Sequence, residues 1–442
     1  MAGGTWLSQN KVRPGAYINF KAVPKSLMTV GDRGIVAMGL PLSWGAEGRL
    51  IEVLSTDLID GTSRKLVGFT AFDSESKLLA GALNYCYKAL VYRMDTGGDK
   101  ATADVGNLVA TAKYAGIFGN KISVAIVEDN SLFNIITYVD GAVVDTQKVA
   151  TIDELESNDY VDFSGEGVLI ANAGTFLTGG TDGTVTDATA YPAMFALLKM
   201  AKWQTFACFS SESEYKASTV SFIRQMRDDE GRYVQAVVSN YANADYEGVI
   251  NSVSSVMIGD VTFSITDFVA IVAGMTAGAD INESNTAKVV ENAIKIVNPM
   301  TDTEIKAGLN AGQFIISESS SGKIKVEQDI NSLHTFTSEK PYDYSKNRVI
   351  RVLDEIGTTT KITWEDSYMG KANNNDNGRA IFKADLMKYG TELERLEAIQ
   401  NFDGVADIIV AKGEAIDAVV ADWYIQPVDA MEKLYLNVNL RG

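Results

Sequence analysis

Between Pro41 and Pro192 the chain has no proline, and glycine turns separate runs in which apolar and polar residues alternate. The runs at 122–126 and 133–137 are followed by a turn at Gly141 and a further run. Alternation with a period of two is typical of a half-buried strand, and tight turns between such runs indicate antiparallel pairing. Residues 101–180 are therefore predicted to form a β-sandwich.

After Gly183 strand and helix patterns alternate. Helices are predicted at 190–201 and 215–227, strands at 205–210 and 233–239, and a buried apolar helix at 268–277. Such alternation favours an α/β layer with parallel strands. Before the sandwich, the predicted elements are strands at 34–40 and 89–94 and a helix at 77–84.

The last part of the chain predicts a smaller α+β unit. Its helices are expected at 346–356 and 379–400, and its strands at 408–411, at 418–425 and at the C-terminus. The fold class is thus a multidomain mixture of α/β and α+β. It has a β-sandwich insertion and a central α/β layer domain.

Composition excludes several classes of function. With 442 residues the chain exceeds one ordinary core, so two to four domains are expected. The net charge of −18 argues against binding to nucleic acid or to an anionic membrane surface. Cys86 and Cys208 have apolar neighbours and suit buried thiols of a reducing compartment. The N-terminus shows no signal pattern, so assembly in the cytoplasm is expected.

The apolar helix at 268–277 is too short to span a bilayer, and no membrane insertion is expected. Gly274 and Gly278 have the spacing of small residues at a helix contact. Close packing on a neighbouring element of the same chain is the favoured interpretation, and a dedicated oligomer contact is the alternative.

No sequence pattern contains the residues that catalysis or metal binding requires. The one histidine, His334, excludes a multi-histidine metal site and is interpreted as structural, in a strand. Gly322 and Lys323 resemble part of a phosphate loop. However, Ser317 stands where its first glycine is needed, and Ile324 stands where its hydroxyl residue is needed. The run 373–378 resembles a calcium loop, yet Ala384 stands where the bidentate acid is needed, so a loop capping the next helix is expected. We expect no catalytic residue, cofactor or metal.

Two glycine-containing motifs point to an assembly subunit. Residues 111–127 read TAKYAGIFGNKISVAIV, and residues 177–183 read LTGGTDG. Together they resemble the β-sandwich domain of contractile phage tail sheath proteins and the junction that follows it. Four further motifs occur in the family's order, at 14–20, 243–250, 273–280 and 330–335. The resemblance spans most of the chain and is greatest to the shorter type, found in phages and phage-tail-like bacteriocins of Gram-positive hosts.

The resemblance implies a division into domains in which both chain ends form an inner domain. The implied parts are an N-terminal strand arm (1–20), the first part of the inner domain (21–95), the β-sandwich (96–182), the α/β sheath domain (184–330), the C-terminal part of the inner domain (331–429) and a C-terminal arm (430–442).

Both arms have the alternation of strands. In the N-terminal arm the candidate residues are Tyr17, Ile18 and Phe20. In the C-terminal arm they are Leu434, Leu436, Val438 and Leu440. Each strand could pair within its own domain. The family resemblance instead implies that the arms add strands to a sheet of neighbouring subunits.

Basic residues gather in the last third of the chain. Arg379, Lys383 and Lys388 lie on the predicted helix 379–400. A solvated helix face is the simpler interpretation. The resemblance implies that this helix faces the inner tail tube, which makes these three residues candidates for contact with an acidic tube.

The function implied is that of a structural subunit and not an enzyme. Hexameric rings of this chain would stack around an inner tail tube, in a virion tail or a bacteriocin particle assembled in the host cytoplasm. A metastable extended state would then contract. The implied partners are other copies of the chain, the tube, the baseplate and the tail terminator. The alternatives are an α/β enzyme with a β-sandwich appendage, or the sheath of a related contractile injection system.

Overall fold

The computed structural model describes residues 2–4, 15–17 and 28–441 and divides into two compact units. The larger unit comprises Gly31–Thr358 and Pro427–Gly442, and the smaller comprises Met1–Val30 and Thr359–Gln426. The mixed architecture predicted from the sequence is confirmed.

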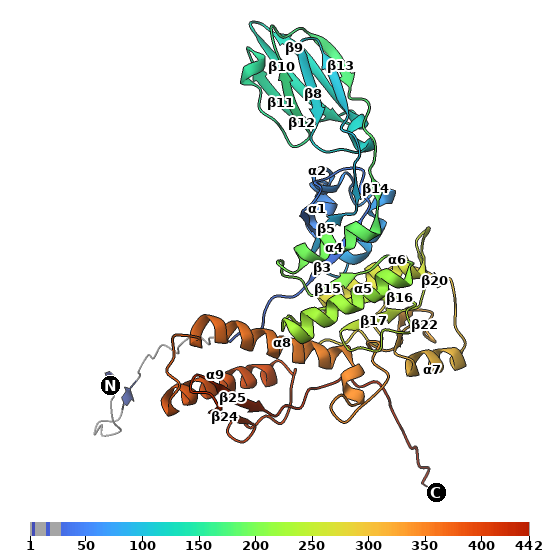
Figure 1. The fold of residues 1–442 in the computed structure, drawn as a ribbon. Coiled ribbons are helices and arrows are strands. Elements are labelled where there is room, and N and C mark those ends of the chain that lie inside the picture. The colour runs from blue at the N-terminus through green and yellow to red at the C-terminus, as the bar shows by residue number, and fades with distance from the viewer. Residues whose placement is uncertain (1, 5–14, 18–27, 442) are drawn as a thin grey trace. The chain divides into compact units, whose positions relative to one another are not determined.

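A seven-stranded sheet forms the centre of the larger unit, in the order β21-β17-β16-β15-β3-β5-β4 (Figure 1). Its neighbours pair in parallel, except for the antiparallel pair β4 and β5. The predicted parallel α/β layer is therefore confirmed. The strands are β3 (Ile35–Leu40), β4 (Leu50–Leu54), β5 (Lys88–Arg93), β15 (Thr205–Ala207), β16 (Gln235–Ser239), β17 (Val249–Ser252) and β21 (Gln313–Phe314).

This strand order corrects the grouping of residues 21–95 with the C-terminal region. Val36 of β3 pairs with Ala89 of β5 on one side and with Thr205 of β15 on the other. Strands from before and after the sandwich therefore share one sheet. The sequence could not show this because the pairing joins residues more than 160 positions apart.

Both faces of the sheet are covered by helices. Val36 and Met38 join one hydrophobic cluster with α3 and α6, whereas Ile35 and Ala37 join another with α4 and α5. Parallel sheets need cover on both faces because their strands are apolar on both sides. The helices are α1 (Ser55–Asp60), α2 (Ser63–Val67), α3 (Lys77–Leu83), α4 (Asp187–Leu198), α5 (Ser213–Arg224), α6 (Ile265–Gly278) and α7 (Asp302–Asn310).

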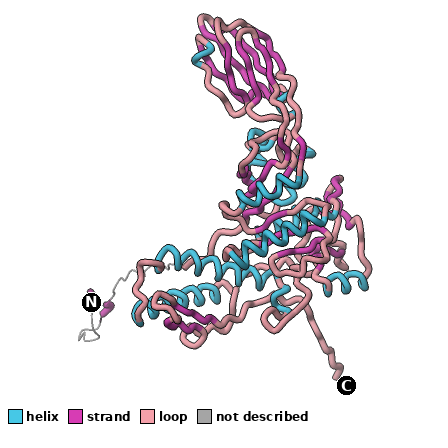
Figure 2. The backbone as a smooth tube through the Cα atoms, viewed as in Figure 1, coloured by secondary structure: helices cyan, strands magenta, loops and turns pink. Residues whose placement is uncertain are grey.

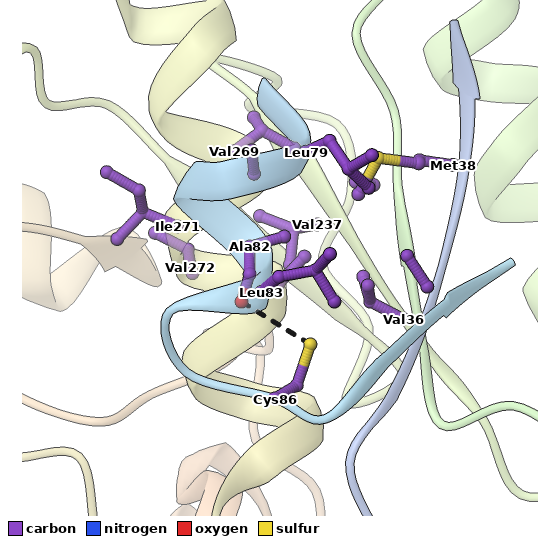
Figure 3. Packing of buried hydrophobic residues seen from close by; sticks show 14 of the residues in the cluster. Val36, Met38, Leu79, Ala82, Leu83, Cys86, Val237, Val269, Ile271 and Val272 are labelled. Carbon is purple, nitrogen blue, oxygen red and sulfur yellow. Dashed lines mark hydrogen bonds between the residues drawn. The ribbon is translucent and has the colours of Figure 1, made fainter. Parts of the chain in front are cut away.

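Helix α6 is the most deeply buried of these helices. Its first turn is capped by Ser264, whose hydroxyl accepts the backbone N–H of Asp267. Figure 3 shows Val269, Ile271 and Val272 of α6 packed beside α3. A Cβ at Gly274 or Gly278 would overlap the backbone carbonyl of Ala82 or Tyr85 respectively. The two glycines thus allow close contact with the α3 region, which confirms the packing interpretation.

The β-sandwich consists of a four-stranded sheet, β11-β10-β9-β13, and a three-stranded sheet, β12-β8-β7. Figure 2 shows this part as strands and loops with only short helical turns. Asn120 exchanges two hydrogen bonds with the backbone of Gly180, so the two glycine motifs lie together. The strands are β7 (Thr102–Val105), β8 (Leu108–Ala112), β9 (Ile122–Asp129), β10 (Leu132–Val139), β11 (Ala142–Val149), β12 (Val161–Gly165) and β13 (Asn172–Phe176).

Shorter sheets complete the larger unit. The pair β6 (Asp95–Thr96) and β14 (Thr184–Val185) joins the chain entering the sandwich to the chain leaving it. The others are formed by β18 (Val256–Ile258), β19 (Val261–Phe263) and β20 (Ala293–Ile296), and by β22 (Ile316–Glu318) and β23 (Ile324–Val326).

In the smaller unit, α9 (Asp376–Arg395) packs on the hairpin of β24 (Ile408–Lys412) and β25 (Val419–Trp423). Helix α8 (Asn347–Thr363) contributes residues to both units and runs further than the predicted 346–356. Strands β1 (Ala2–Gly4) and β2 (Gly15–Tyr17) pair in parallel.

Replacement of Gly278 by alanine tests the contact between α6 and the α3 region. We expect Gly278→Ala to lower the free energy of unfolding by about 1–3 kcal/mol, because the added methyl would force two backbones apart. Urea denaturation measures this, with Gly31→Ala as the control because its Cβ would have no neighbour closer than 3.8 Å. An unchanged stability combined with lost assembly would favour the oligomer contact instead.

Candidate assembly surfaces

The C-terminal arm does not form the strand expected at the chain end. Between residues 427 and 441 no strand is formed, which corrects that prediction. Both sides of the alternating run are exposed, since Leu436 is 71% exposed and Tyr435 88%. The candidate residues Leu434, Val438 and Leu440 are each at least 79% exposed. A strand needs a partner for its backbone groups, and the described part of the larger unit supplies none.

In the N-terminal arm, Tyr17 ends β2 and its backbone pairs with Gly4 of β1. The other two candidates, Ile18 and Phe20, lie outside the described residues.

The hairpin of β24 and β25 has two open edges, because its sheet contains these two strands and no other described strand. The N–H of Tyr424 donates to the carbonyl of Asp407 at 2.8 Å, and the N–H of Gly413 to that of Ala418 at 2.9 Å. Hydrogen-bonded pairs therefore recur at every second residue between these points, and the N–H of Ala421 points away from the hairpin. This edge can accept a further strand.

One face of the hairpin is anchored to the smaller unit. Ile408 is fully buried, and the ring of Trp423 lies 6.0 Å from that of Tyr389 on α9. A groove of about 620 Å³ borders Val419 of β25 and is lined by the side chains of Trp364, Tyr368 and Phe382, among others. An apolar side chain of an added strand would find a cavity there.

The three basic candidates on α9 are not equally available. Arg379 is bound by Asn374 and Asp376, and the ammonium of Lys383 donates to the carbonyl of Val405 at 3.0 Å. These groups therefore already have partners within the smaller unit.

Lys388 keeps the most exposed side chain of the three, at 55%, although Asp385 lies 3.4 Å away. Ile381 and Arg395 are also exposed, although Arg395 is paired with Glu392, and they are spaced seven residues from Lys388 on either side. A spacing of seven residues places them along one stripe of the helix. Sequence reasoning missed this stripe because buried and exposed basic residues look alike in a sequence.

The motifs that resembled chemical sites have structural roles. His334 is not in a strand, contrary to the prediction, and its backbone N–H donates to Asp245 at 2.9 Å while its ring contacts the carbonyl of Ser332. Gly322 lies in the turn between β22 and β23. Asn375 accepts the N–H of Gly378 and caps α9, which confirms that interpretation of the 373–378 loop.

Cys86 and Cys208 are both buried and unpaired by disulfide, as expected. Burial raises the pKa of the Cys86 thiol to about 12, so it stays protonated at neutral pH. Among residues 28–441 no group of three or more acidic, histidine or cysteine side chains is arranged to hold a metal ion. None of the described helices combines the length and apolar character required to cross a membrane.

Three models of phage tail sheath domains match this chain. Residues 96–182 match the model of the phage tail sheath protein β-sandwich domain, residues 183–332 that of the central domain, and residues 339–441 that of the C-terminal domain. The phage-like element PBSX protein XkdK of Bacillus subtilis (strain 168) is 34% identical over the whole of both chains.

Two solved structures extend the comparison. A sheath tail protein from Desulfitobacterium hafniense is 39% identical and superposes with a TM-score of 0.82, covering 96% of this chain and 99% of its own. The helical sheath of the anti-feeding prophage in its contracted state is 12% identical with a TM-score of 0.58, covering 97% and 99% of the two chains, which shows a shared fold.

A sandwich inserted in a doubly covered sheet, followed by a small domain, is thus the architecture of a tail sheath protein. The chain belongs to the phage tail sheath protein family.

Proposed function

We propose that this chain polymerises as stacked hexameric rings around an inner tail tube and contracts from a metastable extended state to drive the tube through a cell envelope. The observation that supports the proposal is that one chain contains two incomplete elements. The C-terminal arm has the residue alternation of a strand, but after Glu432 it is exposed and pairs with no described strand. The hairpin of β24 and β25 is a sheet whose edges pair with no other described strand. A second copy of the chain would supply what each lacks.

Strand donation suits an assembly that changes shape. Backbone hydrogen bonds between the arm of one subunit and the hairpin of another keep neighbours joined while their outer domains repack. Apolar side chains of the arm would enter the groove beside Val419. No nucleotide is required in this scheme, because each subunit releases a few kcal/mol of stored conformational energy and many subunits act together.

The shared fold with a contracted helical sheath supports assembly into a tail-like particle. The baseplate and the tail terminator would end the stack of rings. The stripe of Ile381, Lys388 and Arg395 on α9 is the proposed tube-facing surface, with Arg379 and Lys383 as supporting candidates.

Removal of either arm tests strand exchange. Chains lacking residues 1–20 or residues 430–442 should remain soluble monomers and form no tubes, because each loses the strand that joins neighbours. Electron microscopy of the concentrated proteins, with the full-length chain beside them, gives the answer. Tubes formed by both truncated chains would refute the arm mechanism.

A proline in β25 tests the acceptor edge. Ala421→Pro removes an N–H that points away from the hairpin, so the hairpin should remain while an added strand loses one hydrogen bond. The loss of about 1 kcal/mol would raise the protein concentration needed for tubes about five-fold. Ala421→Val keeps the N–H and serves as the matched control. If Ala421→Pro and Ala421→Val form tubes at the same protein concentration, β25 is excluded as the acceptor edge.

Charge reversal on α9 tests the tube-facing surface. We expect Lys388→Glu to weaken binding to the purified tube about five-fold, and Lys383→Glu to have a smaller effect because its ammonium is already bound to Val405. A pull-down measures both, with Lys306→Glu on α7 as a control at another exposed lysine. Unchanged binding by Lys388→Glu would contradict the assignment.

A further inference from the structure

One side chain of the C-terminal segment is held by the larger unit. The carboxylate of Glu432 accepts a hydrogen bond from the hydroxyl of Thr286 at 2.7 Å and another from the amide of Gln328 at 2.7 Å. It also accepts one from the ammonium of Lys346. The side chain of Glu432 is only 11% exposed, whereas every residue from 433 to 441 is exposed. Glu432 is therefore the last residue of the described chain that the body of the subunit holds.

The three residues that bind Glu432 form a socket, and a second carboxylate fixes its geometry. The N–H of Asp329 donates to the hydroxyl of Thr286 at 2.8 Å, so the hydroxyl hydrogen is free to point at Glu432. Asp329 also accepts the backbone N–H of Asn285 and the side-chain amide of Asn347, at 2.9 and 2.8 Å. The loop after α6, the loop after β23 and the start of α8 are thereby joined. The socket is thus supported by contacts that do not involve the arm.

Electrostatics make the socket selective for a carboxylate. The side chain of Lys346 is 6% exposed, and a buried ammonium requires an anionic partner. Burial lowers the pKa of Lys346, but the hydrogen bond and charge of Glu432 outweigh this and raise it above its usual value. Burial raises the pKa of Glu432, but hydrogen bonds from Lys346, Gln328 and Thr286 outweigh this and lower it. Asp429, 3.6 Å from Lys346, adds a second and weaker contact.

We propose that the socket of Thr286, Gln328 and Lys346 is the anchor of the C-terminal arm, and that Glu432 is the positioning residue that fixes where the arm leaves its own subunit. This role rests on the proposed strand exchange. The ten residues after Glu432 can extend about 33 Å, so the position of the anchor determines which acceptor edge they reach. Without it only the weaker contact of Asp429 would remain, so the free segment would lengthen by at least three residues, which lowers the effective concentration of the arm at any one acceptor.

The position of the arm in the monomer is the first measurement. The native cysteines are both buried, so Thr303→Cys on α7 and Asn437→Cys in the arm allow selective spin labelling. The distance distribution between the two labels should be at least twice as broad in Glu432→Ala as in the parent chain, and Glu432→Gln should fall between them. Asp260→Ala removes an exposed carboxylate elsewhere and should leave the distribution unchanged.

A reciprocal variant approaches the contact from the socket. Lys346→Met keeps the length of the side chain and removes its charge, so Glu432 retains two of its three partners. The distribution should again broaden, by less than in Glu432→Ala. An equal width in Glu432→Ala, Lys346→Met and the parent chain would overturn the proposal, as would a parent distribution already as broad as that of a free tail.

Assembly separates this inference from the proposed function. A chain lacking residues 434–442 keeps the anchor at Glu432 but loses the arm that would be donated. The variant Glu432→Ala keeps the arm but loses its anchor. We expect the first to form no tubes and the second to require a several-fold higher protein concentration. Tubes from the truncated chain would count against strand exchange itself. Loss of tubes on truncation with an unchanged threshold for Glu432→Ala would refute the anchor alone.

Discussion

The burial of both faces of the seven-stranded sheet is the constraint on which the larger unit depends. Alternate residues of β3 enter two separate hydrophobic clusters, and helices cover each of them. On one side α6 approaches the α3 region so closely that Gly274 and Gly278 touch backbone carbonyls directly. The α6 helix can lie this close because neither glycine carries a Cβ. Parallel pairing and glycine packing therefore support each other.

The sandwich is an insertion that this sheet tolerates, because its entry and exit strands, β6 and β14, pair with each other. Trp44, from the loop after β3, is fully buried in the sandwich core and contacts the rings of Phe118 and Tyr160. The insertion, residues 96–182, carries 13 acidic and 4 basic side chains. A strong negative charge keeps such a surface hydrated and limits nonspecific association.

A buried ion pair also fixes the position of the first part of α8. Asp354 forms two hydrogen bonds with the guanidinium of Arg227, at 2.8 and 2.6 Å, and both side chains are almost fully buried. Although burial lowers the pKa of Arg227, Asp354 outweighs it and raises the pKa. Breaking one such buried pair is costly, whereas forming it demands a defined geometry. The socket for Glu432 follows the same principle just before the helix, where the buried ammonium of Lys346 is paired with Glu432 and, more weakly, with Asp429.

The sequence by itself determined the elements with strong local periodicity, such as β9, β10 and α6, together with the parallel α/β layer and the family. It also predicted arms with strand alternation and the helix-capping role of the 373–378 loop, since turns and caps depend on neighbouring residues. Only the tertiary structure decided which strands share a sheet, that the C-terminal arm is exposed on both sides, and which lysine of α9 is available. It alone brought Thr286, Gln328, Lys346 and Glu432 together. These outcomes depend on pairings between distant residues, and no local pattern encodes which distant partner a strand or a charge will meet.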